Sequence, residues 1–108
     1  MEPLQISSGD VPGSLRLSGE LDISNVEHVK GELQRVFRET GRLALDTSDM
    51  TFMDSQGLRM LIHLGDQAAA EGTTIQVTNC SPQVQRVLDL SVPKGIPGVE
   101  IIRTERQG

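Results

Sequence analysis

The chain has 108 residues, a length typical of one compact domain with an ordinary hydrophobic core. Its 10 Lys and Arg against 15 Asp and Glu give a formal net charge of −5, which argues against nucleic-acid binding and favours a basic protein partner. Two Phe and no Trp or Tyr argue against an aromatic platform for bases or sugars, and the single Cys80 excludes an internal disulfide.

The N-terminal segment predicts a hairpin of two strands. Apolar and polar residues alternate over residues 4–6 and again over residues 15–17, which is the period of a β-strand. Residues 9–13 between them contain the Gly, Asp and Pro that favour turns. We expect Gly19 to end the hairpin.

The segment 22–40 has the period of an amphipathic helix. Asp22 or Ser24 can cap its start, and Gly41 can end it. Gly31 lies inside this helix at a cost of about 1 kcal/mol relative to Ala, and we expect it to permit close packing. The apolar residues recur at spacings of three and four and predict one buried stripe of Ile23, Val26, Val29, Leu33, Val36 and Phe37.

Residues 43–45 begin a largely apolar strand, which is typical of a sheet covered by helices on both faces. An acidic loop follows, and the helical period then returns from Ser55 to about Glu71, with Gly72 at its end. The inner face of this helix is predicted to contain Leu58, Leu61, Ile62, Ala68 and Ala69.

The C-terminal third predicts a strand, a short helix and an edge strand. Residues 74–78 are rich in β-branched residues, and Ser81 followed by Pro82 is a strong helix start. Pro and Gly then break the chain over 91–98, and residues 99–102 can form a last strand. The short helix is predicted to turn Val84, Val87 and Leu88 inward.

These elements predict an α/β fold in one domain over residues 1–108, with a core of about 3–103 and a polar tail of 104–108. The order β-β-α-β-α-β-α-β indicates a small mixed sheet of four or five strands with about three or four helices packed on it. Because there is no N-terminal apolar run and no long apolar stretch, we expect a cytoplasmic protein without membrane contact.

The loop before the second long helix is strongly acidic. Between Ala44 and Leu58 there is no Lys or Arg, but there are Asp46, Asp49 and Asp54. Grouped carboxylates suit acid–base catalysis, a magnesium site or a charged recognition surface. Turn and cap chemistry is the simpler alternative, since Asp favours both.

Ser55 at the junction of loop and helix has three interpretations. It can cap the helix by accepting a hydrogen bond from a first-turn amide, so that Ser55→Ala would cost about 1 kcal/mol. It can carry a phosphate, which those amides and the helix dipole would attract and which adds about −1.5 to −2 charges. It can also be a nucleophile, as in a small serine hydrolase.

The hydrolase interpretation has the least support in the sequence. Ser55 lies in D-S-Q-G and not in the G-x-S-x-G turn of many hydrolases. The two histidines, His28 and His63, fall within helical stretches, and His63 lies two turns beyond Ser55. We therefore predict no catalytic residue, no metal site and no cofactor.

Four motifs follow one another on the predicted elements: LSGELD at 17–22, LDTS at 45–48, FMDSQGL at 52–58 and VQRVLDL at 84–90. Together they resemble the STAS domain family, the sulfate transporter and anti-sigma factor antagonist domain. The resemblance covers nearly the whole chain and implies the small sheet with packed helices of that family. Two features depart from the family pattern, namely Gln56 beside the serine, which would narrow the range of kinases, and the Pro-rich segment 91–98.

The resemblance implies a stand-alone anti-sigma factor antagonist, a monomer or weak dimer without enzyme activity. Its unphosphorylated form would bind an anti-sigma factor serine kinase of the GHKL type and so release the sigma factor. The kinase would phosphorylate Ser55 and end the binding, and a PP2C-like phosphatase would reverse this. The residues expected to contact the partner are Asp22, Met53, Asp54, Ser55, Gln56 and Gly57.

A second function remains open within the same family. The domain can be a non-switched adaptor of a lipid-transport ATPase or of a stress-signalling assembly, with Ser55 only as a cap. Met50, Phe52 and Met53 would then supply the docking surface, although two of these three are expected in the core. The serine of the D-S-x-G motif favours the switch.

Overall fold

The computed structural model describes residues 3–102 of the chain, and the predicted polar tail, residues 104–108, lies outside this part. The elements follow in the predicted order and confirm the α/β class. They are β1 (Gln5–Ser8), β2 (Ser14–Leu21), α1 (Val26–Thr40), β3 (Ala44–Met53), α2 (Ser55–Ala70), β4 (Ile75–Thr78), α3 (Pro82–Ser91) and β5 (Val99–Ile102).

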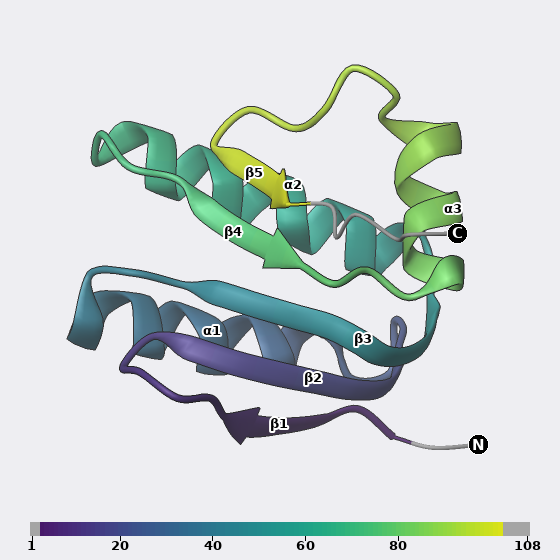
Figure 1. The fold of residues 1–108 in the computed structure, drawn as a ribbon, viewed down its shortest axis with the longest axis horizontal. Coiled ribbons are helices and arrows are strands. Elements are labelled where there is room, and N and C mark those ends of the chain that lie inside the picture. Colours follow the sequence, from purple (N-terminus) through teal and green to yellow (C-terminus); the bar gives the residue numbers. More distant parts are fainter. Residues whose placement is uncertain (1–2, 103–108) are drawn as a thin grey trace.

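The strands form one five-stranded mixed sheet in the order β1-β2-β3-β4-β5 (Figure 1). β1 pairs with β2 in the antiparallel sense, as the predicted hairpin requires, and the later neighbours are all parallel. Each parallel connection contains a helix, because the chain must return to the other end of the sheet before the next parallel strand can begin. β3 pairs with β2 along most of its length but with β4 only over residues 44–46, and α3 lies beside its free end (Figure 1).

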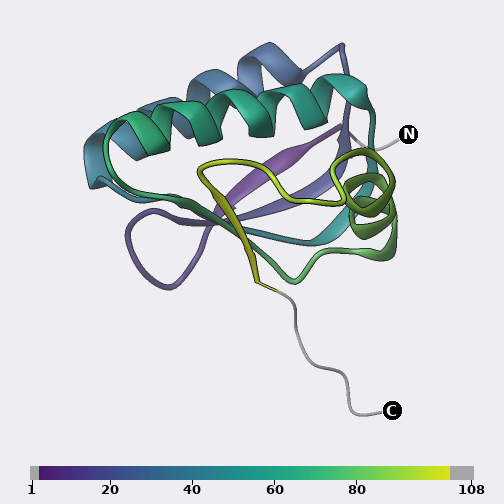
Figure 2. The same ribbon diagram turned by 90° about the horizontal axis from the view of Figure 1, so that it is seen from above.

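Both long helices lie side by side on one face of the sheet (Figure 2). Each crossover advances in the same direction across the sheet, so connections of one handedness bring their helices to the same face. The expectation of a sheet covered on both faces was therefore wrong. Alternate residues of β2 and β4 turn polar side chains away from the helices and are only partly buried or exposed: Arg16, Ser18, Glu20, Gln76 and Thr78.

The core between helices and sheet is aliphatic, as the composition predicts. The buried face of α1 contains Val26, Val29, Leu33 and Phe37, and that of α2 contains Gly57, Met60, Leu61, Leu64, Gly65 and Ala68. Three predicted members of these stripes lie outside the core: Ile23 is 73% exposed, Ile62 is 38% exposed and Ala69 is exposed. No helix among residues 3–102 combines the length and apolar character needed to cross a bilayer.

The start of α1 differs from the prediction. The helix begins at Val26, not at Asp22, and Asn25 is its N-cap residue without a side-chain capping bond. The Asn25 amide is used instead to hold the preceding loop, because its Nδ2 donates to the carbonyl of Glu20 at 2.8 Å and its Oδ1 accepts from the Asp22 N–H at 3.1 Å. Ile23 thus belongs to the loop, which explains its exposure.

Other boundaries were predicted more closely. Gly41 ends α1 with φ +75°, and the Ser81 hydroxyl caps α3 by accepting from the Val84 N–H at 3.2 Å. Gly19 does not end β2, which continues to Leu21; with φ +96° it lies at an irregularity in the β2–β3 register. α3 extends to Ser91, and the open segment 92–98 that follows includes the buried Ile96 and leads into β5, the predicted edge strand.

Two helical glycines have opposite surroundings. A Cβ at Gly31 would meet nothing within 4 Å, so the expected close packing is absent there. A Cβ at Gly65 would lie 2.4 Å from the carbonyl oxygen of Pro97, because α2 passes directly over the segment that precedes β5. Gly65 is thus required by a backbone approach, whereas Gly31 is not.

The two glycines should respond oppositely to alanine. Gly31→Ala should raise the free energy of unfolding by about 1 kcal/mol, the usual helical preference for Ala over Gly. Gly65→Ala should lower it by about 1–3 kcal/mol, because the backbone must shift to admit the methyl group. Urea denaturation of the two variants measures both changes, and a stabilised Gly65→Ala would contradict the close approach.

Candidate functional site

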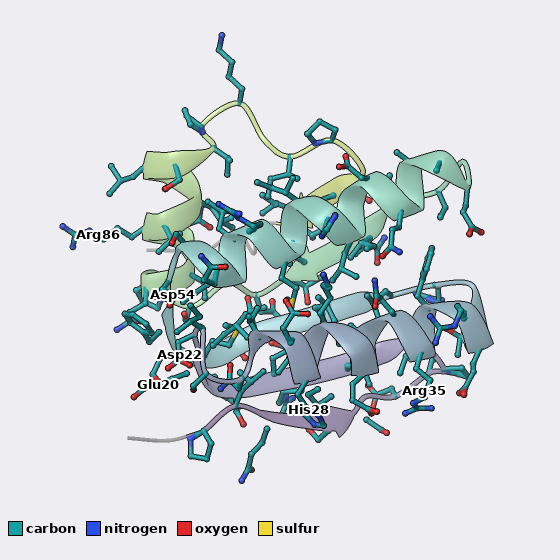
Figure 3. The ribbon with its side chains drawn as sticks, turned by 180° about the vertical axis from the view of Figure 1, so that it is seen from behind. Glu20, Asp22, His28, Arg35, Asp54 and Arg86 are labelled. Carbon is teal, nitrogen blue, oxygen red and sulfur yellow. The ribbon has the colours of Figure 1, made fainter. Side chains whose placement is uncertain are left out.

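The carboxyl ends of β2 and β3 bring the predicted acidic residues together. Leu21 pairs with Met53, and the Asp54 N–H donates to the carbonyl of Leu21 at 3.3 Å. Since parallel strands end at the same edge of a sheet, Asp22 and Asp54 emerge next to each other. Figure 3 shows both carboxylates, with that of Glu20, gathered at this end of the molecule.

Asp54, and not Ser55, caps α2. One oxygen of the Asp54 carboxylate, Oδ1, accepts from the N–H of Gln56 at 2.9 Å and from the N–H of Gly57 at 3.2 Å. The Asp54 carbonyl accepts the first helical hydrogen bond, from Leu58, at 3.2 Å. The expectation that Ser55 is the cap was wrong by one residue, because Asp competes with Ser for this position equally well.

Ser55 is therefore the first residue of α2 and is exposed. Its hydroxyl makes no hydrogen bond within residues 3–102, so the cap interaction leaves it available. Gln56 beside it is half-buried. The arrangement presents one unengaged hydroxyl at the edge of an acidic surface.

Asp22 is held in place by its own loop. Its Oδ1 accepts from the Ser24 hydroxyl at 2.5 Å and from the Ser24 N–H at 2.9 Å. These hydrogen bonds favour the ionised form and lower the pKa of the Asp22 carboxyl. Asp22 thus contributes an ordered negative charge next to Asp54.

Asp46 and Asp49 lie in β3 and not in a loop, because β3 continues to Met53. Burial would raise the pKa of Asp46, but hydrogen bonds from Ser48 and Asn79 and the charge of Arg16 outweigh it and lower that pKa. Arg16 Nε lies 3.8 Å from Asp46 Oδ2. Asp46 thus accepts locally from Ser48, as a turn-forming Asp does, but it lies within β3 and also contacts Arg16 of β2 and Asn79 after β4.

Some of the expected partner residues are accessible at the surface, and others are buried beneath it. Asp22, Asp54, Ser55 and Gln56 reach the surface to different degrees, whereas Met53 is only 4% exposed and Gly57 is buried. A Cβ at Gly57 would lie 2.5 Å from Met53 Cγ and 2.9 Å from Leu21 Cδ2. Gly57 therefore lets the start of α2 approach the ends of β2 and β3.

Of the three residues considered as a docking surface, two are core residues, as expected. Met50 and Met53 are buried, whereas Phe52 is 45% exposed. Phe52 pairs with Glu20 across the β2–β3 register, close to the acidic residues. A large exposed aromatic beside a charged cluster is typical of a contact surface.

Within residues 3–102, neither histidine is placed to act as the base of a hydrolytic serine at position 55. His63 lies eight residues further along α2, about 12 Å at the helical rise, and its Nδ1 is 3.4 Å from Lys30 Nζ. His28 lies on the exposed side of α1, away from Asp54 (Figure 3). The described residues also hold no group of three or more His, Cys, Asp or Glu placed to bind a metal ion.

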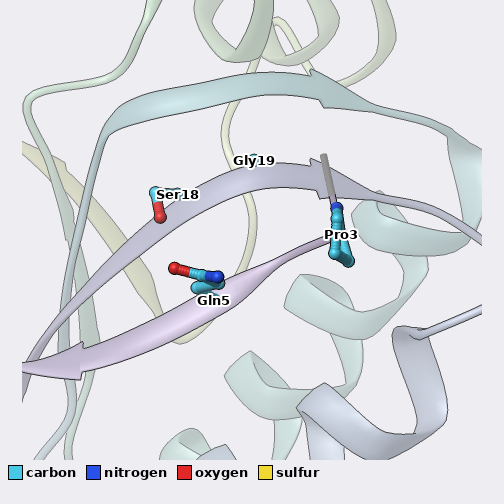
Figure 4. A pocket seen from close by; sticks show the side chains of 4 residues that line it. All are labelled: Pro3, Gln5, Ser18 and Gly19. Carbon is cyan, nitrogen blue, oxygen red and sulfur yellow. The ribbon is translucent and has the colours of Figure 1, made fainter. Parts of the chain in front are cut away.

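A hollow of about 110 Å³ lies between β1 and β2 (Figure 4). It is lined by Pro3, Gln5, Ser18 and Gly19, so it offers no charged side chain and no nucleophile other than one hydroxyl. A second groove, of about 230 Å³, runs between α1 and α2 and includes Gln56 and Arg59. This second groove adjoins Ser55.

Sequence reasoning named Asp54 as a partner contact but not as the cap, because Asp54 and Ser55 both suit the N-cap position before the periodic segment. It did not consider Arg59, which lines the groove beside Ser55. Arg59 was detectable from its spacing, four residues after Ser55, which puts both on one side of a helix.

The cap assignment can be tested by stability. Asp54→Ala should lower the free energy of unfolding by about 1 kcal/mol, since two first-turn amides lose their acceptor. Ser55→Ala should change it by less than about 0.5 kcal/mol, in the range of ordinary surface substitutions. Urea denaturation distinguishes the two, and a larger loss in Ser55→Ala than in Asp54→Ala would return the cap to Ser55.

The sequence and the fold match known proteins throughout this region. A family model described as "Mlab, STAS domain" matches residues 4–92. A STAS-domain containing protein of Pseudomonas aeruginosa (strain UCBPP-PA14) is 31% identical over 78 residues, 72% of this chain and 77% of that protein. The anti-sigma F factor antagonist of Paenibacillus polymyxa is 30% identical over 79 residues, 71% of this chain and 68% of that protein.

The fold also resembles the anti-sigma factor antagonist SpoIIAA, solved in its unphosphorylated form. That structure superimposes with a TM-score of 0.65 at 16% identity and covers 97% of this chain and 90% of its own, which shows the shared fold. The family model covers the site from the end of β2 through α2 and all of α3. The chain belongs to the STAS domain family.

Proposed function

We propose that this protein is an anti-sigma factor antagonist controlled by phosphorylation of Ser55. Its unphosphorylated form binds an anti-sigma factor serine kinase of the GHKL type in the cytoplasm and releases the sigma factor. The observation that carries the proposal is the exposed, unengaged hydroxyl of Ser55 at the start of α2, directly after Asp54, whose carboxylate is held by the helix amides. The names of a relative and of a structural neighbour point to the same class.

The reaction belongs to the kinase, and this chain supplies the acceptor. A bond forms between Ser55 Oγ and the γ-phosphorus of ATP, the bond from that phosphorus to the β–γ bridging oxygen breaks, and ADP leaves. The hydroxyl proton passes to a base of the kinase or to solvent. A PP2C-like phosphatase reverses the change when water attacks phosphorus, phosphate leaves and Oγ regains a proton.

The charge around Ser55 explains why a phosphate would end binding. Glu20, Asp22 and Asp54 already make this end of the molecule acidic (Figure 3). A phosphate adds about −1.5 to −2 charges at one point of that surface. A partner surface that packs against a neutral hydroxyl must then desolvate a dianion, which strongly disfavours the complex.

Other hydroxyls of the same region are less suitable acceptors. Thr47 is buried and its hydroxyl donates to the carbonyl of Thr78 at 3.3 Å. Ser48 donates to Asp46 Oδ1 at 2.7 Å. Thr51 is exposed, but it lies within β3 and not at the start of a helix. Ser55 combines exposure with freedom from such interactions.

The switch can be tested with three variants as baits in a lysate of the source cells, read by mass spectrometry. Wild type and Ser55→Ala should capture a GHKL-type kinase, and Ser55→Asp should lose it, with at least a tenfold weaker Kd for the purified pair. Ser8→Asp adds the same charge at the opposite end of the sheet and should bind like wild type. Equal kinase affinity of wild type and Ser55→Asp would rule out the switch.

Phe52 provides an independent test of the contact surface. Phe52→Ser should weaken kinase binding about tenfold or more, because an exposed aromatic at an interface centre contributes strongly. Val11→Ser removes an apolar side chain of similar exposure, 48%, from the β1–β2 turn and serves as the control. Titration calorimetry measures both, and equal losses in the two variants would exclude a specific role for Phe52.

A second function is favoured by the description of the matching family model, which names Mlab. In that case the domain is a non-switched adaptor of a lipid-transport ATPase or of a stress-signalling assembly, with Phe52 in the docking surface. The same baits distinguish the two functions. An ATPase outside the GHKL class, captured equally by wild type and Ser55→Asp, would favour the adaptor.

A further inference from the structure

The amides at the start of α2 are already occupied. Asp54 Oδ1 accepts from Gln56 and Gly57, and the Leu58 N–H donates to the Asp54 carbonyl. A phosphate on Ser55 could use the first two donors only by displacing the cap. A cation on a neighbouring side chain can therefore stabilise the phosphorylated form without disturbing the cap.

Arg59 is the nearest such charge along the helix. It lies four residues after Ser55, and residues four apart are neighbours on a helix surface. Helical side chains lean toward the N-terminus, so the Arg59 side chain extends over the turn that carries Ser55. Arg59 is exposed and has no hydrogen bond or ion pair within residues 3–102.

The groove between α1 and α2 strengthens this positive surface. Its volume is about 230 Å³, and Gln56, the neighbour of Ser55, lies in its wall. Lys30 and Arg59 are positively charged and Glu27 is negatively charged, so the groove carries a small positive charge in contrast to the net charge of the whole chain. The groove is lined by Val26, Glu27, Lys30, Gln56, Arg59, Met60 and His63.

We propose that Arg59 is the intramolecular counter-ion of phosphorylated Ser55. The planar guanidinium donates two hydrogen bonds to the phosphate oxygens, a geometry that Lys cannot reproduce. Lys30 is held beside His63, one turn further along the groove, and adds a weaker attraction at longer range. The phosphate thus lies against α2 at the mouth of the groove, and a phosphatase must break this ion pair to reach it.

Charged residues of both signs lie near the same point, and the negative ones increase the benefit of a counter-ion to the phosphate. Asp54 is the adjacent residue, and Glu27 faces the groove from α1. Glu20 and Asp22 lie at the end of β2, and Arg86 lies on α3 at the same end of the molecule (Figure 3). Among the Lys and Arg residues of 3–102, Arg59 alone lies on α2 four residues after Ser55, the spacing that suits a helical ion pair.

The inference rests on Ser55 being the phosphoacceptor, but its test does not need the kinase. Phosphoserine can be incorporated at position 55 during synthesis, and the pKa of the second phosphate ionisation can be followed by ³¹P NMR. Because a nearby cation favours the dianion, Arg59→Gln should raise this pKa by about 0.2–0.4 of a pH unit, the size expected of a helical ion pair. Arg59→Lys should give a phosphate pKa between that of the parent protein and that of Arg59→Gln.

Arg38→Gln is the matched control, since it removes one exposed Arg from the last turn of α1, and it should leave the phosphate pKa unchanged. The same pKa in the parent and in Arg59→Gln, or an equal change in Arg38→Gln, would overturn the assignment of Arg59. This result would leave the proposed switch intact. The opposite result is also distinguishable. If Arg59→Gln changes the phosphate pKa but Ser55→Asp does not change kinase binding, the ion pair is confirmed and the switch is rejected.

Discussion

The capping interaction of Asp54 determines the geometry of the whole site. Its N–H donates to the carbonyl of Leu21 on β2, and its carboxylate accepts from two amides of α2. One residue thus connects two strand ends to the start of a helix. Gly57 allows the helix to descend onto Leu21 and Met53 without a Cβ in the way. With both positions set, Ser55 can only lie on the outer side of the first turn.

Local signals in the sequence were sufficient for most of the fold. The order of elements, the Ser81 cap and the Gly41 helix end all depend on residues a few positions apart, where chemistry and spacing decide the structure. The start of α1 was missed because Asn25 uses its amide to bind the carbonyl of Glu20. Asp54 and Ser55 are both good caps, so one sequence could not assign the cap between them.

Other errors arose from contacts between distant segments. The length of β3 depends on its pairing with β2, which continues beyond the point where β4 turns away. The sheet face opposite α1 and α2 is polar because the strand order runs sequentially across the sheet, which brings both helices to the other face. The local sequence near residues 43–45 contains no information about that order. The close approach of α2 to the backbone before β5 at Gly65 likewise depends on the path of that distant segment.

The same geometry would separate the proposed phosphorylation switch from the stability of the fold. If Ser55 were the cap, a phosphate on its oxygen would replace the acceptor of the first turn, and modification would alter the fold together with the binding surface. Because Asp54 performs that task, the hydroxyl of Ser55 makes no contribution that modification could remove. A charge added there acts on what approaches the surface and not on the helix beneath it. A switch of this kind works by electrostatics on an unchanged fold.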